Sequence, residues 1–405
     1  MAKIDELLQE LCPDRVEWKT IKELFETRNG YTPSTKNSSF WTNGDIPWFK
    51  MEDIRDKGHI LSDAYSHITK SALKGKGLFK ANSIILATSA TIGEHALITV
   101  DHLSNQRFTN IYPKEKWVNK IHMKFVYYYM YLIDEWCKTH VKQGSFAAVD
   151  MDGFYKQEIP IPPLSIQQEI VEVLDTFTDA ISNLEEELAL REKQFQYYQD
   201  TLLNFDGETK FISFGESFQL KARIGWQGLT KKEYRSEGNY KLVTGTDFTA
   251  NHRIDFNTCV FVDKDRYDQD KYIQLKNDDV LITKDGTLGK IAYIENLPYP
   301  TTLNGGVFVV RNITGELLQK FTMHYLASSY FKTWISSNHT TGSIKHLTQK
   351  LLVKFNIPVP PIERQQEIVE ILDTFEAMIA NIKEEIALRT KQYEYYREKL
   401  LSFGK

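Results

Sequence analysis

The basic and amide side chains of this 405-residue chain are of the kinds that hydrogen-bond to a nucleic-acid duplex. Lysine and arginine neutralise backbone phosphates, while amide and guanidinium groups bond to base edges in the major groove. In the first half we predict phosphate contacts from six lysines and base contacts from three further residues, namely Lys36, Lys50, Lys70, Lys74, Lys76, Lys80, Asn105, Gln106 and Arg107. In the second half the corresponding candidates are Arg223, Lys231, Lys232, Arg235, Lys284 and Lys290. The alternative for each basic side chain is solvation at the surface without any contact.

The charge of the chain is divided between segments. The net charge of −4 is unfavourable for binding a duplex, because phosphate neutralisation supplies most of the affinity. Residues 165–205 carry −7 and residues 363–403 carry −3, so the remainder of the chain carries +6. The two acidic segments would repel DNA and suit a protein partner, whereas the remainder suits contact with DNA.

Motifs that would make this chain an enzyme acting on DNA are missing or incomplete. No Pro-Pro pair follows Asn or Asp, as in amino-methyltransferases, and residues 286–290 lack the upstream glycine and the trailing Ser or Thr of a phosphate-binding loop. Pro13-Asp14 and Glu17-Trp18-Lys19 imitate a nuclease, but they stand too close together to lie on neighbouring strands around a magnesium ion. We predict no catalytic residue in this chain.

The sequence also lacks the patterns of metal binding, disulfide pairing and membrane insertion. Cys12, Cys137 and Cys259 form no Cys-x-x-Cys pair, and the ten histidines avoid metal-ligand spacings. No stretch reaches the roughly 18 apolar residues of a membrane helix, and the first residues do not resemble a signal peptide. We therefore predict a cytoplasmic protein that binds no metal and no membrane.

A long internal repeat organises the chain. Residues 159–205 recur at 357–403 with 28 identities in 47 positions and without a gap. The offset of 198 residues is too long for a solenoid repeat and matches one domain plus a connector. Each copy starts at a Pro-Pro pair, and in the first copy Ser165 and Gln168 predict a capping box at the start of a helix.

Apolar residues step by four and three through both copies, and this spacing predicts the seam of a coiled coil. In the first copy the seam residues are Ile170, Leu174, Phe177, Ile181, Leu184, Leu188, Arg191, Phe195, Tyr198 and Leu202. In the second copy they are Ile368, Leu372, Phe375, Ile379, Ile382, Ile386, Arg389, Tyr393, Tyr396 and Leu400. The two seam arginines either pair with a flanking glutamate, such as Glu187 or Glu385, or extend to solvent.

A helix of about 40 residues extends roughly 60 Å, which is more than one small domain can cover. The twin helix is the natural partner, and antiparallel pairing needs the least connecting chain. We therefore expect a pseudo-two-fold arrangement with one domain at each end of the helix pair. The alternative is that both segments are unrelated amphipathic helices, each packed on its own domain.

The parts between the helices are diverged copies of one domain. A strand, a turn of small residues and a second strand occur at 83–98 and again at 279–294, and helical segments follow from Lys124 and Lys320. We predict an α+β protein with two mixed α/β domains at 1–158 and 206–356, and a long antiparallel coiled coil from 159–205 and 357–405.

On these features the chain resembles the specificity subunits of type I restriction-modification systems. The resemblance rests on residues 30–54, on Gly144-Ser145 and Gly342-Ser343 ahead of IPIPP and IPVPP, and on two QQEIVE helices that end in LL-x-F. The opening Gly-x-Thr-Pro-Ser pattern occurs in the first domain alone.

The resemblance implies a division of labour. Each domain would be a target-recognition domain for one half of a bipartite sequence in double-stranded DNA. The helices would bind two methyltransferase subunits and set the length of the unread spacer. S-adenosylmethionine, ATP and magnesium would belong to the methyltransferase and restriction subunits, with no cofactor in this chain. A different reading of the same residues is a protein-only scaffold whose acidic helices bind other subunits and whose domains never contact DNA.

Overall fold

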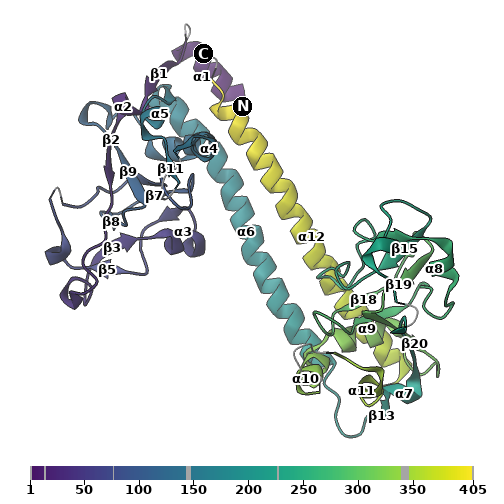
Figure 1. Cartoon of the computed structure of the whole chain (residues 1–405). Helices are drawn as coiled ribbons and strands as arrows, with labels where there is room; N and C mark the ends of the chain where they lie inside the picture. The colour runs from purple at the N-terminus through teal and green to yellow at the C-terminus, as the bar shows by residue number, and fades with distance from the viewer. Residues whose placement is uncertain are drawn as a thin grey trace. The chain divides into compact units, whose positions relative to one another are not determined.

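The computed structural model describes residues 2–12, 15–75, 77–142, 147–225, 228–338 and 346–403. Lys76, Pro13-Asp14 and the two Gly-Ser pairs named above lie outside the described residues. The chain divides into two compact units, Met1–Asn183 with Ala387–Lys405 (unit 1) and Leu184–Ile386 (unit 2). The long helices α6 (Leu164–Leu202) and α12 (Ile362–Leu401) each contribute one part to each unit (Figure 1).

Unit 1 is a mixed α/β domain with two main sheets. The larger has the strand order β2-β9-β6-β7-β4 and the smaller β5-β3-β8. Strand β6 is an apolar run that is buried along its whole length, and α4 packs against β6 and β7. Its helices are α1 (Ala2–Leu11), α2 (Ile21–Leu24), α3 (Met51–Lys57), α4 (Met123–Thr139) and α5 (Met151–Phe154). Its strands are β1 (Glu17–Thr20), β2 (Phe25–Asn29), β3 (Ile46–Phe49), β4 (Ile60–Leu61), β5 (His67–Ile68), β6 (Ser83–Ala87), β7 (His95–Ile98), β8 (Leu103–Ser104), β9 (Phe108–Pro113), β10 (Val141–Lys142), β11 (Ala148–Val149) and β12 (Glu158–Ile161).

Unit 2 repeats this plan, as the diverged sequence predicts. The order β14-β20-β17-β18 corresponds to β2-β9-β6-β7, and β16-β15-β19 corresponds to β5-β3-β8. In both small sheets the middle strand is antiparallel to one neighbour and parallel to the other. Its helices are α7 (Phe214–Ser217), α8 (Lys264–Asp268), α9 (Gln319–Ala327), α10 (Ser329–Ser337) and α11 (Gln349–Leu352). Its strands are β13 (Phe211–Ser213), β14 (Phe218–Lys221), β15 (Tyr240–Val243), β16 (Val260–Val262), β17 (Val280–Thr283), β18 (Ile291–Tyr293), β19 (Thr301–Leu303), β20 (Val307–Asn312) and β21 (Asn356–Pro358).

A short strand leads into each long helix. Strand β12 pairs antiparallel with β1, and β21 pairs in the same way with β13. The prolines that follow end the strand, and α6 begins directly after Pro163. The predicted capping box is therefore wrong, because Ser165 lies inside the first turn of α6 and not before it.

A buried glutamine fixes the start of α6 to the domain that precedes it. Gln167 is fully buried. Its Nε2 donates to the carbonyl oxygens of Lys120 (2.9 Å) and Pro162 (2.7 Å), and its Oε1 accepts from the backbone N–H of His122 (2.8 Å). His122 is the residue before α4, so one side chain ties the start of α4 to the start of α6.

Gln365 makes the same contacts at the start of α12. It is also fully buried. Its Nε2 donates to Glu316 O (2.8 Å) and Pro360 O (2.9 Å), and Leu318 N donates to its Oε1 (2.8 Å). Because buried amide groups are costly to leave unpaired, these two glutamines hold each domain to its helix in one orientation.

An aspartate about two turns further along each helix adds a polar contact to the same domain helix. In unit 1 it is Asp175, which accepts from Lys124 Nζ (2.8 Å) and from the Tyr128 hydroxyl (2.5 Å). In unit 2 the corresponding set is Asp373 with Lys320 Nζ at 2.7 Å and His324 Nε2 at 2.9 Å.

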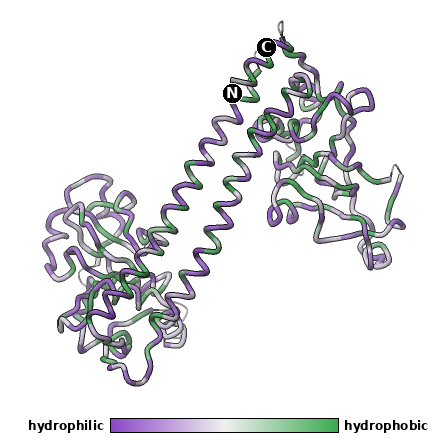
Figure 2. The backbone as a smooth tube through the Cα atoms, turned by 180° about the vertical axis from the view of Figure 1, so that it is seen from behind, coloured by the Kyte–Doolittle hydropathy of each residue, from purple (hydrophilic) through white to green (hydrophobic). Residues whose placement is uncertain are grey.

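The long helices meet along the apolar positions with four-three spacing. In unit 1 Phe177 stacks on Tyr396 with ring centroids 5.2 Å apart, and in unit 2 Tyr198 stacks on Phe375 at 5.1 Å. Glu192 pairs with Lys383 at 2.7 Å. Residue numbers rise along α6 as they fall along α12, so the pairing is antiparallel. Figure 2 shows hydrophobic and hydrophilic stretches alternating along both helices.

The seam residues near the middle of each helix are only half-buried, as expected where two helices cover each other without a third layer. These are Ile181, Leu184, Leu188, Ile379, Ile382 and Ile386. Arg191 reaches Glu187 of its own helix at 3.4 Å and keeps 39% of its side chain exposed, while Arg389 is exposed and donates to Gln392 at 3.2 Å. Both seam arginines therefore stay at the surface.

We predict that Gln167→Ala lowers the free energy of unfolding of unit 1 by about 2–4 kcal/mol, because one buried and two part-buried backbone groups lose their partner. Amide hydrogen exchange at the start of α4 should accelerate together with it. The control is Gln168→Ala, since Gln168 is exposed and bonds only to Glu172 among the described residues, and its loss should cost no more than about 0.5 kcal/mol. Equal effects of the two changes would contradict the role given to Gln167.

Candidate nucleic-acid interface

In unit 1 three loops meet where β2 and β6 end and β9 begins. Gly30 donates its N–H to Phe108 O (3.0 Å), and a Cβ at Gly30 would lie 2.2 Å from Ser104 O. No side chain fits there, so the backbone of the loop after β2 lies directly on the turn before β9. In that turn Gln106 and Arg107 are exposed, and the Thr32 hydroxyl donates to Gln106 Oε1 (2.6 Å).

The third predicted reader in this turn has a structural contact. Asn105 is half-buried, and its Oδ1 accepts from the backbone N–H of Arg107 at 2.9 Å. Its own N–H donates to Phe49 O at 3.0 Å. Asn105 therefore shapes the turn that presents its two neighbours.

The predicted phosphate ligands of unit 1 are spread over several loops. Four of the five that the structure describes are exposed, namely Lys36, Lys70, Lys74 and Lys80. Lys74 and Lys80 lie over the rings of Tyr31 (5.8 Å) and Tyr112 (5.3 Å). Lys50 is half-buried and pairs with Glu52 at 2.5 Å, and this contact competes with any phosphate.

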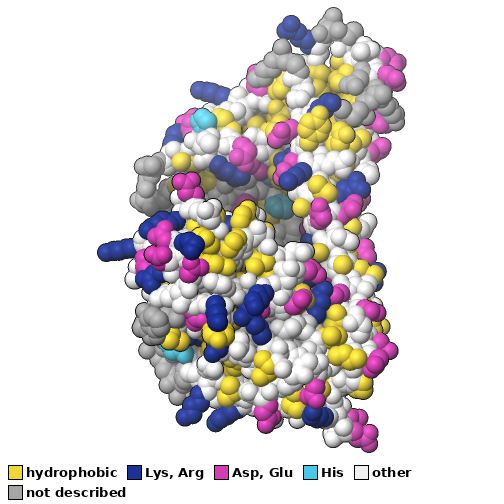
Figure 3. All heavy atoms as spheres, turned by 90° about the vertical axis from the view of Figure 1, so that its right-hand side faces the viewer, with side chains coloured by type: hydrophobic (Ala, Val, Ile, Leu, Met, Phe, Trp, Pro, Cys, Tyr) yellow, Lys and Arg dark blue, Asp and Glu magenta, His cyan; other side chains and the backbone are white. Residues whose placement is uncertain are grey.

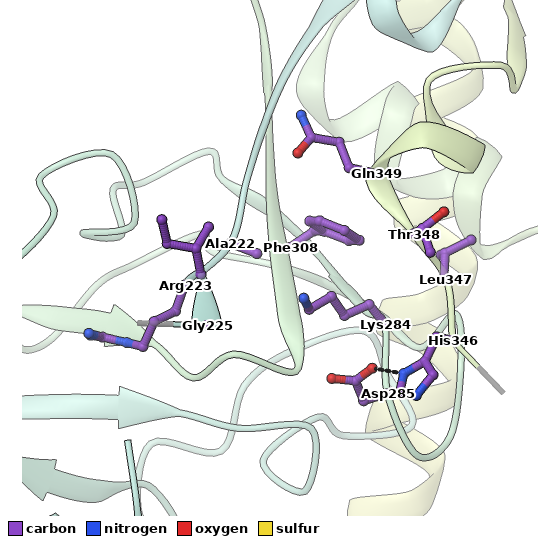
Figure 4. Close-up of a pocket in the computed structure, with 11 residues that line it drawn as sticks. Ala222, Arg223, Gly225, Lys284, Asp285, Phe308, His346, Leu347, Thr348 and Gln349 are labelled. Atoms are coloured by element: carbon purple, nitrogen blue, oxygen red, sulfur yellow. Dashed lines mark hydrogen bonds and ion pairs between the residues drawn. The ribbon is translucent and has the colours of Figure 1, made fainter. Parts of the chain in front are cut away.

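The corresponding corner of unit 2 contains a pocket of about 380 Å³. Lys284, Asp285 and Phe308 line it from the sheet, and residues 346–349 line it from the opposite wall (Figure 4). His346 Nδ1 lies 2.5 Å from Asp285 Oδ1, so the carboxylate fixes the imidazole ring. The Lys284 ammonium lies 5.2 Å from the centre of the Phe308 ring.

Arg223 lines the same pocket, but the structure contradicts its predicted role as a surface DNA ligand. Only 2% of the residue is exposed. Its Nε donates to Leu303 O (2.9 Å), and its terminal nitrogens donate to Gln269 Oε1 (2.8 Å) and Arg266 O (3.1 Å). Burial lowers the pKa of the guanidinium, and the group joins the loop after β14 to the interior of unit 2.

The remaining candidates of unit 2 lie away from that pocket's lining. Lys231 and Lys232 are exposed in a short 3₁₀ turn, and Arg235 pairs with Asp263 at 3.0 Å. Lys290 lines a second pocket beside His252, whose pKa burial lowers to about 4. Figure 3 shows lysine and arginine side chains projecting from one face, with acidic side chains among them. Basic side chains on this face are therefore interspersed with acidic ones and do not form one continuous positive surface.

Four polar residues of this pocket were not predicted from the sequence. They are Asp285, His346, Thr348 and Gln349. The repeat offset of 198 residues leads from Val149 to Leu347, so it marks residues 346–349 as the counterpart of 148–151. It does not indicate that His346 meets Asp285, because that contact joins residues 61 positions apart.

The described residues also bear on metal binding, on the nuclease-like sequence and on membrane insertion. Among the residues that the structure describes, no group of three or more His, Cys, Asp or Glu side chains is placed to hold a metal ion. Lys19 and Glu17 of the nuclease-like sequence pair with each other at 2.9 Å on β1. Within the described ranges no helix combines the length and the apolar character needed to cross a membrane. Trp48 and Phe49 are buried, and the half-buried Trp41 packs edge-on against Trp48 with ring centroids 5.0 Å apart.

Comparison with known proteins gives consistent matches. The family model for the type I restriction modification DNA specificity domain matches twice, over residues 13–191 and 211–388. The chain is 36% identical over 389 residues to the type I restriction enzyme EcoprrI specificity subunit of Escherichia coli, covering 91% of this chain and 90% of the relative. It is 31% identical over 300 residues to the EcoR124I/EcoR124II specificity subunit of the same species, covering 71% and 72%.

Two solved structures share the fold. The S subunit of a type I restriction-modification system from M. genitalium has a TM-score of 0.58 at 18% identity, covering 97% of this chain and 98% of that chain. A structure that describes complex assembly and conformational transition of the type I R-M system has a TM-score of 0.59 at 17% identity, covering 96% and 97%. Both likenesses support the α+β architecture of two domains and long helices.

We predict that Arg223→Ala lowers the free energy of unfolding of unit 2 by about 2–4 kcal/mol, because it leaves buried carbonyl oxygens without a donor and opens a cavity. Arg235→Ala is the matched control, since its ion pair with Asp263 is exposed and worth at most about 1 kcal/mol. Thermal unfolding and amide hydrogen exchange in β15 and β19 would compare the stability of the two variants. An Arg223 variant as stable as the wild type would contradict the interior role.

Proposed function

This chain belongs to the specificity subunits of type I restriction-modification enzymes, and we propose that its two units each read one half of a bipartite target in double-stranded DNA. The observation that supports this most strongly is the duplication itself. Two domains of one topology carry different side chains at the same corner of the sheet. A protein that reads two different half-sites needs one scaffold with two different surfaces.

We also propose that the long helices bind two methyltransferase subunits. Exposed apolar residues occur at equivalent positions of the two helices, outside the antiparallel seam. Leu190 is 66% and Tyr197 66% exposed in unit 2, and their counterparts Leu388 and Tyr395 are 59% and 57% exposed in unit 1. Residues seven apart lie on one face of a helix, so each unit presents one Leu and Tyr patch. Two equal patches suit two copies of one partner.

In this proposal the chain selects the target and leaves the chemistry to its partners. S-adenosylmethionine would bind to the methyltransferase subunits, and ATP and magnesium to restriction subunits. The acidic helices support this arrangement, because they repel DNA and leave it to the more basic domains. The complex would act in the cytoplasm, where the genome is accessible.

We predict that the chain, in complex with its methyltransferase, prefers duplexes that contain a two-part motif over random DNA. Base changes in one half should weaken binding independently of changes in the other half. Affinity should also fall with salt, with a logarithmic slope of about −0.9 per neutralised phosphate. Selection from a randomised duplex library at two salt concentrations measures both effects. Binding without sequence preference and without salt dependence would contradict the proposal and favour the protein-only scaffold.

We predict that Leu190→Asp with Tyr197→Ser reduces the bound methyltransferase subunits from two to one, and that the same changes at Leu388 and Tyr395 remove the other. Placing a charge in an apolar contact is costly to desolvate. Native mass spectrometry of the complex reads the stoichiometry. Lys193→Ser and Lys391→Ser are the controls, because these exposed residues occupy equivalent positions of the two helices. Unchanged stoichiometry in the apolar variants would refute this docking surface.

A further inference from the structure

The reading corners of the two domains share one backbone framework, which backbone hydrogen bonds define. Thr88 donates its N–H to Arg107 O at 3.0 Å, and Lys284 donates to Gly306 O at 2.9 Å. Because the same hydrogen bond occurs in both units, Thr88 is equivalent to Lys284, and Arg107 is equivalent to Gly306.

Two further pairs extend the framework to the neighbouring segments. Val149 N donates to Thr88 O, and Leu347 N donates to Lys284 O, both at 3.0 Å. The N–H of Asn105 donates to Phe49 O (3.0 Å), and that of Asn304 donates to Val243 O (2.9 Å). Four segments of each domain are thus held together by the same main-chain contacts, whatever their side chains are.

The side chains on this framework differ in kind. In the turn before β9, unit 1 has Gln106 and Arg107, whereas unit 2 has Gly305 and Gly306 before β20. A Cβ at Gly305 would meet its nearest neighbour, Arg223 O, at 3.8 Å, and a Cβ at Gly306 would meet Asp285 at 3.7 Å. Neither glycine has the positive φ that would require it. The backbone therefore tolerates a side chain at both positions, and folding does not explain their absence.

At two other positions of this framework, unit 2 has the longer side chains. Unit 2 has Lys284 and His346 where unit 1 has the smaller Thr88 and Ala148. His346 is 48% exposed, and its Nδ1 lies 2.5 Å from Asp285 Oδ1. Each domain thus carries two long polar side chains at this corner, on different loops of one framework.

Gln106, Arg107 and Lys284 match known base-reading chemistry. Arginine and lysine bond to the O6 and N7 acceptors of guanine, and glutamine bonds to N6 and N7 of adenine. The Thr32 hydroxyl donates to Gln106 Oε1 and thereby orients the amide. Direct readout requires a fixed backbone that presents polar side chains to the bases. Gln106, Arg107 and His346 are exposed, and Lys284 is half-buried.

We infer that Gln106 and Arg107 determine the bases read by unit 1, and that Lys284 and His346 determine those read by unit 2. This inference rests on the proposed function of the chain as a DNA reader. The exposed lysines outside this framework, such as Lys70 and Lys80, contact phosphates without selecting a base.

The test is selection from a randomised duplex library with the complete methyltransferase complex. Arg107→Ala and Gln106→Ala should each relax one or two base positions of one half-site, with a loss of discrimination of about 5- to 150-fold. Lys284→Ala and His346→Ala should do the same in the other half-site only. Gly306→Arg should change the preference of that second half-site, because it places a guanidinium where unit 1 has Arg107.

Lys80→Ala is the control. It should weaken binding to all sequences alike and reduce the salt slope by about 1. Thermal unfolding of each variant checks that the domains remain folded. Lys80, Gln106, Arg107 and His346 are exposed, whereas Lys284 and Gly306 are half-buried, so the check matters most for the last two. A wild type without bipartite preference would overturn the proposed function itself. A wild type with such a preference, and variants that keep it unchanged at every base, would overturn only the assignment of these four readers.

Discussion

The structure depends on two buried glutamine side chains. Gln167 and Gln365 each satisfy three backbone groups, and those groups belong to the end of a domain and the start of a long helix. An amide in a dry interior has strong directional preferences, so it specifies an angle as well as a contact. The aspartates Asp175 and Asp373 reinforce that angle from the same helix face. The junction thus orients each domain on the part of the long helix that belongs to the same unit.

The sequences on the two sides of this junction have diverged to different extents. The helices keep 28 of 47 residues, whereas the domains keep a topology and a set of main-chain bonds. Interior bonds constrain sequence because an unpaired buried group costs more than a lost surface contact. Exposed turns have no such constraint, so their side chains are free to change with the target. The polar difference between residues 106–107 and 305–306 illustrates this freedom.

Much of the fold follows from local patterns. Four-three spacing and the exact repeat indicate two long helices and two related domains, and apolar strand runs such as 83–98 indicate the sheets. The patterns fail where a residue's role depends on distant partners. Arg223 is of a residue type that often binds DNA, but its guanidinium bonds to residues that are 43 or more positions away in the sequence. Ser165 fits a capping motif, yet the prolines start the helix earlier. Gln167 stands beside the exposed Gln168, and only the fold distinguishes them.

The division of the chain has a consequence for its synthesis on the ribosome. The core of unit 1 includes Tyr393, Leu400 and Leu401 from the end of α12, packed among residues such as Phe125 and Tyr128. At about 5–20 residues per second, roughly 10–40 s pass between translation of the first half of α6 and that of the final turns of α12. During this delay the nascent first domain exposes the aromatic surface that those turns later cover. Unit 2 is contiguous, so it completes its own core before the domain that was translated ahead of it.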